Sequence, residues 1–229
     1  MGSWQRQKGA GDMREFRALT PDRVADLTGP CAPCSFWQTV PHNGHVVEPD
    51  PLVLLTDWVR QVTEDWGPPG EVVYVDDVPQ GYVLLAPARH VPRLAAFATA
   101  PSDPSTLMLL TTCTDPAGSH RDLRKTLVQH AAKEALRHKV RSIESIGAKP
   151  AAIRRHPCVL EVEALERSGF RIERDHPTYP RLRLDLRTVL SLRDEVAGVA
   201  ARALAWVPGL KPVQEAPHPD GVTRARTHD

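Results

Sequence analysis

The spacing of apolar and polar residues predicts a strand followed by an amphipathic helix in the middle of the chain. Residues 106–113 form a short apolar run rich in Leu and Thr, closed by an Asp-Pro pair, as is typical of a buried strand. From Leu123 onward, apolar residues recur every three or four positions while charged residues occupy the other face. The pattern therefore predicts a strand, a tight loop and a helix that ends near Lys139.

The residues before this unit carry the pattern of a strand and two helices. Residues 15–19 alternate as a strand does, and a short helical pattern follows them. Asp50 and Pro51 are typical of a helix start, with Asp as the N-cap and Pro in the first turn. That helix places one set of apolar residues on a single face: Leu52, Leu55, Val59, Val62 and Trp66. We expect Trp58 and Trp66 to belong to the core.

A hairpin is predicted between this helix and the central strand. Strands over 71–75 and 81–86 flank a turn over 76–80 that contains two Asp residues and a Pro. Residues 87–104 then form a longer connection. This connection could line a substrate groove or simply cover one edge of the sheet.

The second half of the chain carries the pattern of three further strands and two further helices. The strands are expected over 141–148, 170–173 and 179–186. A short helix over 158–168 is ended by Gly169, and a last helix runs from Thr188 to Trp206. The last helix could dock on its own domain or on another subunit.

Composition and length favour one domain with tails. We expect a disordered arm over 1–13, a domain over 14–206 and a disordered tail over 207–229. The 29 basic and 28 acidic residues give a net charge of +1, which argues against nucleic acid or an anionic membrane as partner. Because no long apolar run and no signal-peptide pattern is present, we expect a cytoplasmic protein.

The four cysteines are expected to be reduced thiols. Cys31 and Cys34, followed by His42 and His45, could supply four ligands to a tetrahedral zinc ion. The alternative is that both cysteines pack as small hydrophobic residues under a neighbouring helix. We favour packing, and therefore expect no metal.

The strand, loop and helix of the central unit resemble the acetyl-CoA loop of the GNAT acetyltransferase superfamily. The resemblance extends over residues 14–206 and includes the Gly81-Tyr82 pair and the segment from Cys158 to Phe170. It is most similar to an actinobacterial subgroup of these proteins. It implies an α/β (α+β) fold whose central mixed, mostly antiparallel sheet is flanked by helices, with acetyl-CoA as co-substrate.

The resemblance also implies where acetyl-CoA would bind. Three positions of the family's loop pattern, an Arg or Gln, a Gly and a Gly or Ala, are occupied by Ser119, Asp122 and Arg124, so this loop is degenerate. The nearby cations could restore a positive field. The implied cofactor-binding residues are Thr112, Cys113, Thr114, Arg121, Leu123, Arg124, Lys125, Thr126 and Cys158.

Two residues are candidates for catalytic roles. Leu165 stands where the family has the tyrosine that protonates the CoA thiolate, and leucine cannot donate a proton. Tyr179 is the remaining phenol near the implied cleft, or else it packs on a neighbouring strand. Glu144 is a candidate general base, because a carboxylate in an apolar sheet must be paired or lie in a wet cleft. The alternative for Glu144 is an ion pair with an arginine at the surface.

Two functions follow from this reading. The first is an acetyl-CoA-dependent N-acetyltransferase whose acceptor is an amine of a small molecule or a protein. The second is a GNAT-shaped protein without turnover that serves as a binding or regulatory module. Binding of acetyl-CoA discriminates between them, because only the enzyme requires it.

Overall fold

The computed structural model divides the chain into two compact units, Met1–Val189 and Leu190–Asp229. All described residues belong to the first unit, namely 13–32, 34–41, 50–116, 123–153, 156 and 158–186. The predicted arm, the tail and the helix from Thr188 to Trp206 lie outside these ranges, so they remain predictions. None of the described helices combines the length and the apolar character that a membrane crossing requires.

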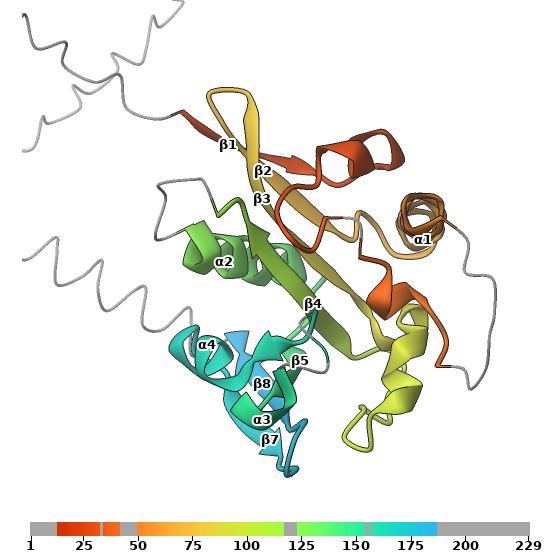
Figure 1. The fold of residues 1–229 in the computed structure, drawn as a ribbon, viewed down its shortest axis with the longest axis vertical. Coiled ribbons are helices and arrows are strands. Elements are labelled where there is room, and N and C mark those ends of the chain that lie inside the picture. The colour runs from red at the N-terminus through yellow and green to blue at the C-terminus, as the bar shows by residue number, and fades with distance from the viewer. Residues whose placement is uncertain are drawn as a thin grey trace, which may run out of the picture. The chain divides into compact units, whose positions relative to one another are not determined.

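The order of strands and helices agrees with the sequence pattern (Figure 1). The strands are β1 (Arg14–Ala18), β2 (Gly70–Val75), β3 (Val78–Pro87), β4 (Leu107–Thr114), β5 (Ser142–Ala148), β6 (Leu160–Glu161), β7 (Arg171–Arg174) and β8 (Arg181–Asp185). The α-helices are α1 (Pro51–Asp65), α2 (Leu123–Arg137), α3 (Pro150–Ile153) and α4 (Val162–Arg167). Short 3-10 turns are η1 (Pro21–Asp26), η2 (Phe36–Gln38), η3 (Ala88–His90) and η4 (Pro92–Ala96).

One sheet joins these strands in the order β1-β2-β3-β4-β5-β8-β7. Its neighbours are antiparallel except β4 and β5, which are parallel, and β6 pairs with β5 off the main path. The helix α2 connects the parallel pair, as such a crossover requires. The expected class, a mixed and mostly antiparallel sheet flanked by helices, is confirmed.

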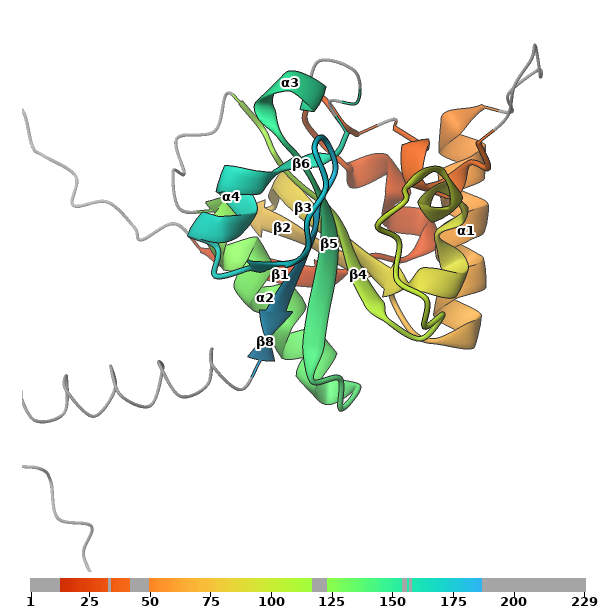
Figure 2. The same ribbon diagram turned by 90° about the horizontal axis from the view of Figure 1, so that it is seen from below.

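Helices lie on both faces of the sheet (Figure 2). One apolar cluster lies between the sheet and α1, and includes Leu55, Val59 and Val62. A second cluster lies between the sheet and the helices α2 and α4. Each helix presents an apolar face to the sheet because its apolar residues recur at helical spacing.

The predicted inner face of α1 is wrong at its first residue. Leu52 is 46% exposed, whereas Trp66 is partly buried and packs against both apolar clusters. The buried face is centred instead on Leu55 and Trp58, whose indole nitrogen donates a hydrogen bond to the His90 carbonyl at 2.7 Å. Leu52 lies in the first turn of the helix.

The predicted hairpin forms, but its turn is shorter than expected. Asp76 and Asp77 alone make the turn, with φ of 50° and 63°. Two consecutive residues with positive φ form a type I′ turn, whose twist matches that of the flanking strands. The strand β3 therefore begins at Val78 rather than at Gly81.

The helix predicted over 158–168 begins later than expected. Leu160 and Glu161 extend into β6 and pair with Gly147 and Ala148 of β5. The helix α4 therefore starts at Val162. The predicted stop at Gly169 is confirmed, because this residue has φ of 96° after the last turn.

A β-bulge in β4 sets which residues face which helix. Leu84 pairs with Thr111 and Leu85 pairs with Leu109, so Leu110 is the extra residue. The inserted residue reverses the alternation of side chains beyond it. As a result Thr112 faces α2, while Cys113 belongs to the cluster beneath α1.

Candidate functional site

The site centres on an edge of β4 that no strand covers in the described part of the chain. The single ladder pair between β4 and β5 is Met108 with Glu144. Just beyond it, the Ser145 hydroxyl donates a hydrogen bond to the Leu109 carbonyl at 2.9 Å. From there to Thr114, backbone groups on this edge have no strand partner. Such groups can bind the polar atoms of an extended ligand.

The α2 side of this edge holds several of the predicted cofactor residues. Thr112 and Arg124 line a cavity of about 10 Å³, enough for about one water molecule. Leu160 and Leu165 close it from the side of β6 and α4. Arg124 and the next residue, Lys125, are exposed at the start of α2, where the helix dipole also favours an anion.

The remaining cofactor candidates fall into different environments. The Leu123 side chain is buried in the core, so only its backbone could contact a ligand. Thr126 is partly buried in the first turn of α2, and Thr114 lies at the end of β4, opposite Gly81. Arg121 lies outside the described residues, as do Ser119 and Asp122.

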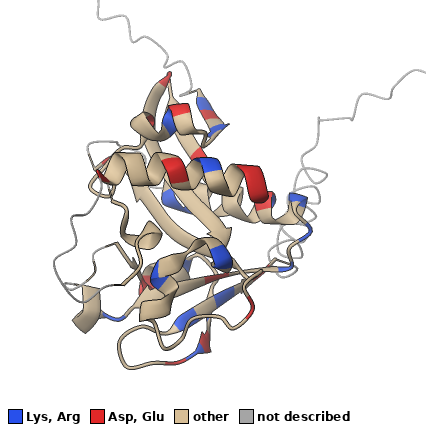
Figure 3. Cartoon of the chain, turned by 90° about the vertical axis from the view of Figure 1, so that its right-hand side faces the viewer, with Lys and Arg blue, Asp and Glu red and all other residues tan. Residues whose placement is uncertain are grey.

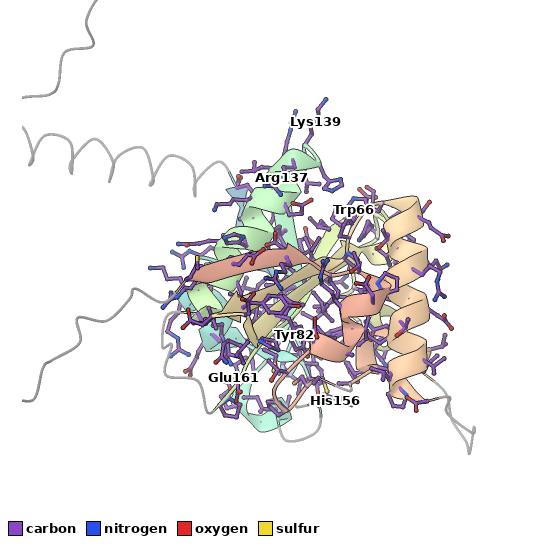
Figure 4. All side chains as sticks on the ribbon, turned by 90° about the horizontal axis from the view of Figure 1, so that it is seen from above. Trp66, Tyr82, Arg137, Lys139, His156 and Glu161 are labelled. Atoms are coloured by element: carbon purple, nitrogen blue, oxygen red, sulfur yellow. The ribbon has the colours of Figure 1, made fainter. Side chains whose placement is uncertain are left out.

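The other side of the same edge gathers all four cysteines of the chain. The Sγ atoms of Cys34 and Cys158 are 2.8 Å apart. Cys31 is hydrogen bonded to Cys113 and Cys158, and Cys113 also contacts the phenol of Tyr82. Figure 4 shows Tyr82 at the same end of the sheet as His156 and Glu161, away from Arg137 and Lys139. We call the four cysteine side chains, Cys31, Cys34, Cys113 and Cys158, the thiol cluster.

Hydrogen bonds within the thiol cluster divide its members by acidity. The Cys113 thiol, and then the Cys158 thiol, lower the pKa of Cys31 by hydrogen bonding to its sulfur. The Cys158 thiol likewise lowers the pKa of Cys34 to about 7. The same bonds raise the pKa of the two donors, Cys113 and Cys158. Cys31 and Cys34 are therefore the members of the cluster whose pKa is lowered.

Glu144 is buried rather than exposed, and two arginines of β8 hold it. Its carboxylate contacts Arg181 at 2.9 Å and Arg183 at 3.5 Å. Burial raises the pKa of Glu144, and the two guanidinium groups oppose that rise. The alternative of an ion pair with arginine therefore holds, but inside the sheet instead of at the surface.

Tyr179 packs among aromatic side chains. Its ring lies edge-on to Phe97 with centroids 5.3 Å apart, and its hydroxyl is 3.5 Å from the Ala152 carbonyl. The Thr99 hydroxyl donates to the Tyr179 backbone carbonyl at 2.8 Å. The contacts of Tyr179 and Glu144 therefore run to different groups, and these contacts do not join them into one catalytic unit.

The connection over 87–104 both covers the sheet and forms a hollow. Val91, Leu94 and Phe97 are buried in the cluster beneath α1. Other residues of the same connection line an open depression of about 360 Å³. Arg89 is the charged residue in its lining, so the depression offers little chemistry.

Comparisons with known proteins identify the fold. No family model matches the sequence, and no curated protein matches it. An N-acetyltransferase from Staphylococcus aureus Mu50 is 11% identical with a TM-score of 0.50, over 76% of this chain and 99% of that chain. The Salmonella typhimurium protein yncA, assigned as an acetyltransferase and solved with acetyl-CoA, is 16% identical with a TM-score of 0.50, over 76% and 94%. The fold is that of the GNAT acetyltransferases.

A third structure belongs to the same group. It is an assigned GNAT-family acetyltransferase from Desulfovibrio desulfuricans, 17% identical with a TM-score of 0.46, over 76% of this chain and 99% of that chain. At such identities the two structures with a TM-score of 0.50 show the fold alone, so the chemistry must be argued from the residues of this chain.

Sequence reasoning named residues on the edge of β4 as cofactor candidates but missed the thiol cluster. It assigned Cys31 and Cys34 to a packing role or to zinc with two histidines, and Cys113 and Cys158 to the cofactor. It gave Tyr82 no role at the site. No spacing rule relates these residues, because the β4 bulge and the loop after β5 bring them together. The one signal in the sequence was that the pair Cys31 and Cys34 and the pair Cys113 and Cys158 each lay next to elements predicted to form the site.

Proposed function

We propose that the chain is an acetyl-CoA-dependent N-acetyltransferase of the GNAT type, acting on an amine of a small molecule or a protein. The observation that carries this proposal is the stretch of the β4 edge that pairs with no strand in the described part of the chain, beside the exposed cations of α2. An acyl-pantetheine arm is a chain of amides, and its polar atoms match the donors and acceptors of an unpaired strand edge. The phosphates at the other end of CoA would meet Arg124 and Lys125.

Residues of this chain carry the chemical groups that binding of acetyl-CoA requires. The edge of β4 from Leu110 to Thr114 supplies backbone N–H groups that would hold the thioester carbonyl and stabilise the negative charge it gains. The cavity of about 10 Å³ beside Thr112 is far smaller than a pantetheine arm. Binding would therefore run along the outer edge, or would displace β6 and α4 from β4.

The acyl transfer itself needs few side chains. A neutral amine held against the thioester carbonyl attacks it, and the CoA thiolate leaves. Positioning alone can supply much of the rate, so the leucine at position 165 does not rule out turnover. Glu144 is the candidate general base, and burial raises its pKa. Tyr179 is the candidate proton donor.

Titration calorimetry with acetyl-CoA tests this function. We expect binding by the wild-type protein, and an affinity loss of about tenfold or more in Arg124→Glu, because a charge-assisted contact becomes a repulsion. Lys133→Glu is the matched control, since it is exposed on the same helix about 2.5 turns further on. Equal losses in the two variants would refute the proposed phosphate site.

The second candidate function is a GNAT-fold binding or regulatory module without turnover. Two observations favour it: the cavity at β4 is small, and Glu144 is held by two arginines. This function predicts no heat and no thermal stabilisation with acetyl-CoA up to millimolar concentration. Binding without acetylation of any amine in a broad panel, read by mass spectrometry, would also support it.

Charge gives no further guide to the acceptor. Acidic and basic residues are interspersed over the described elements (Figure 3). No strong field therefore selects between a small amine, a peptide N-terminus and a lysine side chain.

A further inference from the structure

The thiol cluster has a chemistry of its own, which the proposed acetyl transfer does not use. Its members come from three separate places in the fold. Cys31 and Cys34 lie between η1 and η2, Cys113 is the second-last residue of β4, and Cys158 precedes β6. Cys34 and Cys158 are 124 positions apart in sequence, so only the tertiary fold brings them into contact.

The sulfur atoms of one pair within the cluster lie in direct contact. The sulfur atoms of Cys34 and Cys158 are 2.8 Å apart, compared with about 2.05 Å in a disulfide bond. Cys34 and Cys158 are both partly exposed, whereas Cys113 is buried. A small oxidant in water can therefore reach the pair.

The geometry does not suit a metal ion. Two thiolates on one tetrahedral zinc ion, with bonds of about 2.3 Å, lie about 3.8 Å apart. Cys34 and Cys158 are closer than that. Within the described residues, no group of three or more Cys, His, Asp or Glu is arranged to hold a metal.

We propose that Cys34 and Cys158 form a redox-active pair that closes to a disulfide when the protein meets hydrogen peroxide. The Cys34 thiolate attacks one peroxide oxygen, the O–O bond breaks, and hydroxide leaves. This step oxidises Cys34 to a sulfenic acid and reduces the peroxide. The Cys158 sulfur then attacks the Cys34 sulfur, the S–O bond breaks, and the oxygen leaves as water with the proton of Cys158.

The neighbours of the pair suit these roles. A thiol whose pKa lies near the ambient pH is the best attacking group, because it combines a thiolate fraction with nucleophilicity. Hydrogen bonding by Cys158 lowers the pKa of Cys34 to about 7, and Arg93 adds a smaller favourable field. Cys158 is already in contact, so it can resolve the sulfenic acid without a large movement.

Closing the pair would tie the segment between η1 and η2 to the loop that precedes β6. The link spans a large part of the chain, including α1, β2, β3, β4, α2 and β5. Disulfides that close long loops restrict the unfolded chain most, so we expect oxidation to raise Tm by several degrees. Reduction by dithiothreitol should reverse the rise.

Peptide mapping of the full chain tests the proposal. The reduced protein is treated with increasing hydrogen peroxide, free thiols are alkylated, and the protein is digested with trypsin without reduction. We expect two thiols to disappear per chain and a linked pair of peptides to form, residues 24–60 with residues 156–167. The readout requires no acetyl-CoA, so its failure and the failure of the acetyltransferase proposal are distinguishable.

Single variants assign the link to its two residues. Cys31→Ser and Cys113→Ser should still form the linked peptides, whereas Cys34→Ser and Cys158→Ser should not. Circular dichroism establishes that each variant is folded. Where a variant does not fold, fragmentation of the linked wild-type peptides by tandem mass spectrometry decides the proposal, because residues 24–60 contain both Cys31 and Cys34, and a link at Cys31 would overturn it.

Three further results would overturn the proposal. The first is full retention of all four thiols at millimolar peroxide in the folded wild-type protein. The second is a link between Cys31 and Cys34 in place of the predicted one. The third is a stoichiometric zinc ion, found by elemental analysis of the purified protein, whose removal by a chelator is required before any thiol reacts.

Discussion

At the scale of single residues, a carboxylate inside a sheet must be balanced by nearby cations. Glu144 lies 5% exposed between β4 and β8, and Arg181 and Arg183 provide the balance. Removing a charge from water is costly, and the attraction of a partner repays only part of that cost. The opposing influences of burial and of the two arginines make the protonation of Glu144 a measurable property.

The stability of the protein should depend on pH through Glu144. Burial raises the pKa of Glu144 above its ordinary value of 4.5. The folded protein therefore keeps this proton at pH values where the unfolded chain has lost it, so the free energy of unfolding falls as pH rises through that interval. In Glu144→Gln this fall is absent, so the variant should become more stable relative to the wild type as pH rises above about 4.5.

Urea unfolding of both proteins across that pH range measures the effect. Glu64→Gln is the control, because Glu64 is exposed on α1, is not among the charges that shift the pKa of Glu144, and should leave the pH profile nearly unchanged. The opposite result, a free energy of unfolding that rises with pH in the wild type relative to Glu144→Gln, would mean that Arg181 and Arg183 outweigh burial in setting the pKa of Glu144.

At the scale of elements, the start of β2 depends on a glycine. Gly70 has φ of 150°, and a Cβ there would lie 1.9 Å from the carbonyl oxygen of Val83 in β3. We expect Gly70→Ala to lower the free energy of unfolding by about 3 kcal/mol or more, because β2 and β3 must separate. Gly169→Ala is the matched control.

The control separates backbone strain from collision. Gly169 also has positive φ, at 96°, but a Cβ there meets only the end of the Leu184 side chain at 3.3 Å. Gly169→Ala should lower the free energy of unfolding by about 1–2 kcal/mol, the strain of the left-handed region alone. Equal losses at Gly70 and Gly169, measured by urea unfolding, would contradict the predicted collision with Val83.

At the scale of the whole described unit, two apolar clusters share one sheet. Leu55 of α1 is buried in one cluster, and Leu127 of α2 is buried in the other, on the opposite face of the sheet. We expect Leu55→Ala and Leu127→Ala each to lower the free energy of unfolding by about 2–4 kcal/mol. The double variant should lose the sum within about 0.5 kcal/mol, because the sheet separates the two sites.

The matched control for these variants is Leu52→Ala. Leu52 is on the same helix as Leu55 but is 46% exposed, so its loss should stay below about 1 kcal/mol. Two separate unfolding transitions in either single variant, detected by fluorescence and circular dichroism, would show that the clusters do not unfold as one unit.

Much of the fold was predictable because it depends on local patterns. Asp50 caps α1 by accepting a hydrogen bond from the Leu52 backbone nitrogen at 2.8 Å, as an Asp-Pro start predicts. The apolar spacing from Leu123 onward yields α2 almost to the residue. The boundaries that failed, at Val78 and Val162, are those where a neighbouring strand competes with the local preference.

The sequence by itself determined the order of elements and the resemblance to a GNAT fold, since periodicity, caps and turn residues act over a few positions. Only the tertiary structure decided the chemistry. The extra residue at Leu110 places Cys113 beneath α1, and the pairing of β6 with β5 places Cys158 beside Cys34. Contacts between residues far apart in sequence depend on strand register and bulges, which single-sequence patterns do not encode.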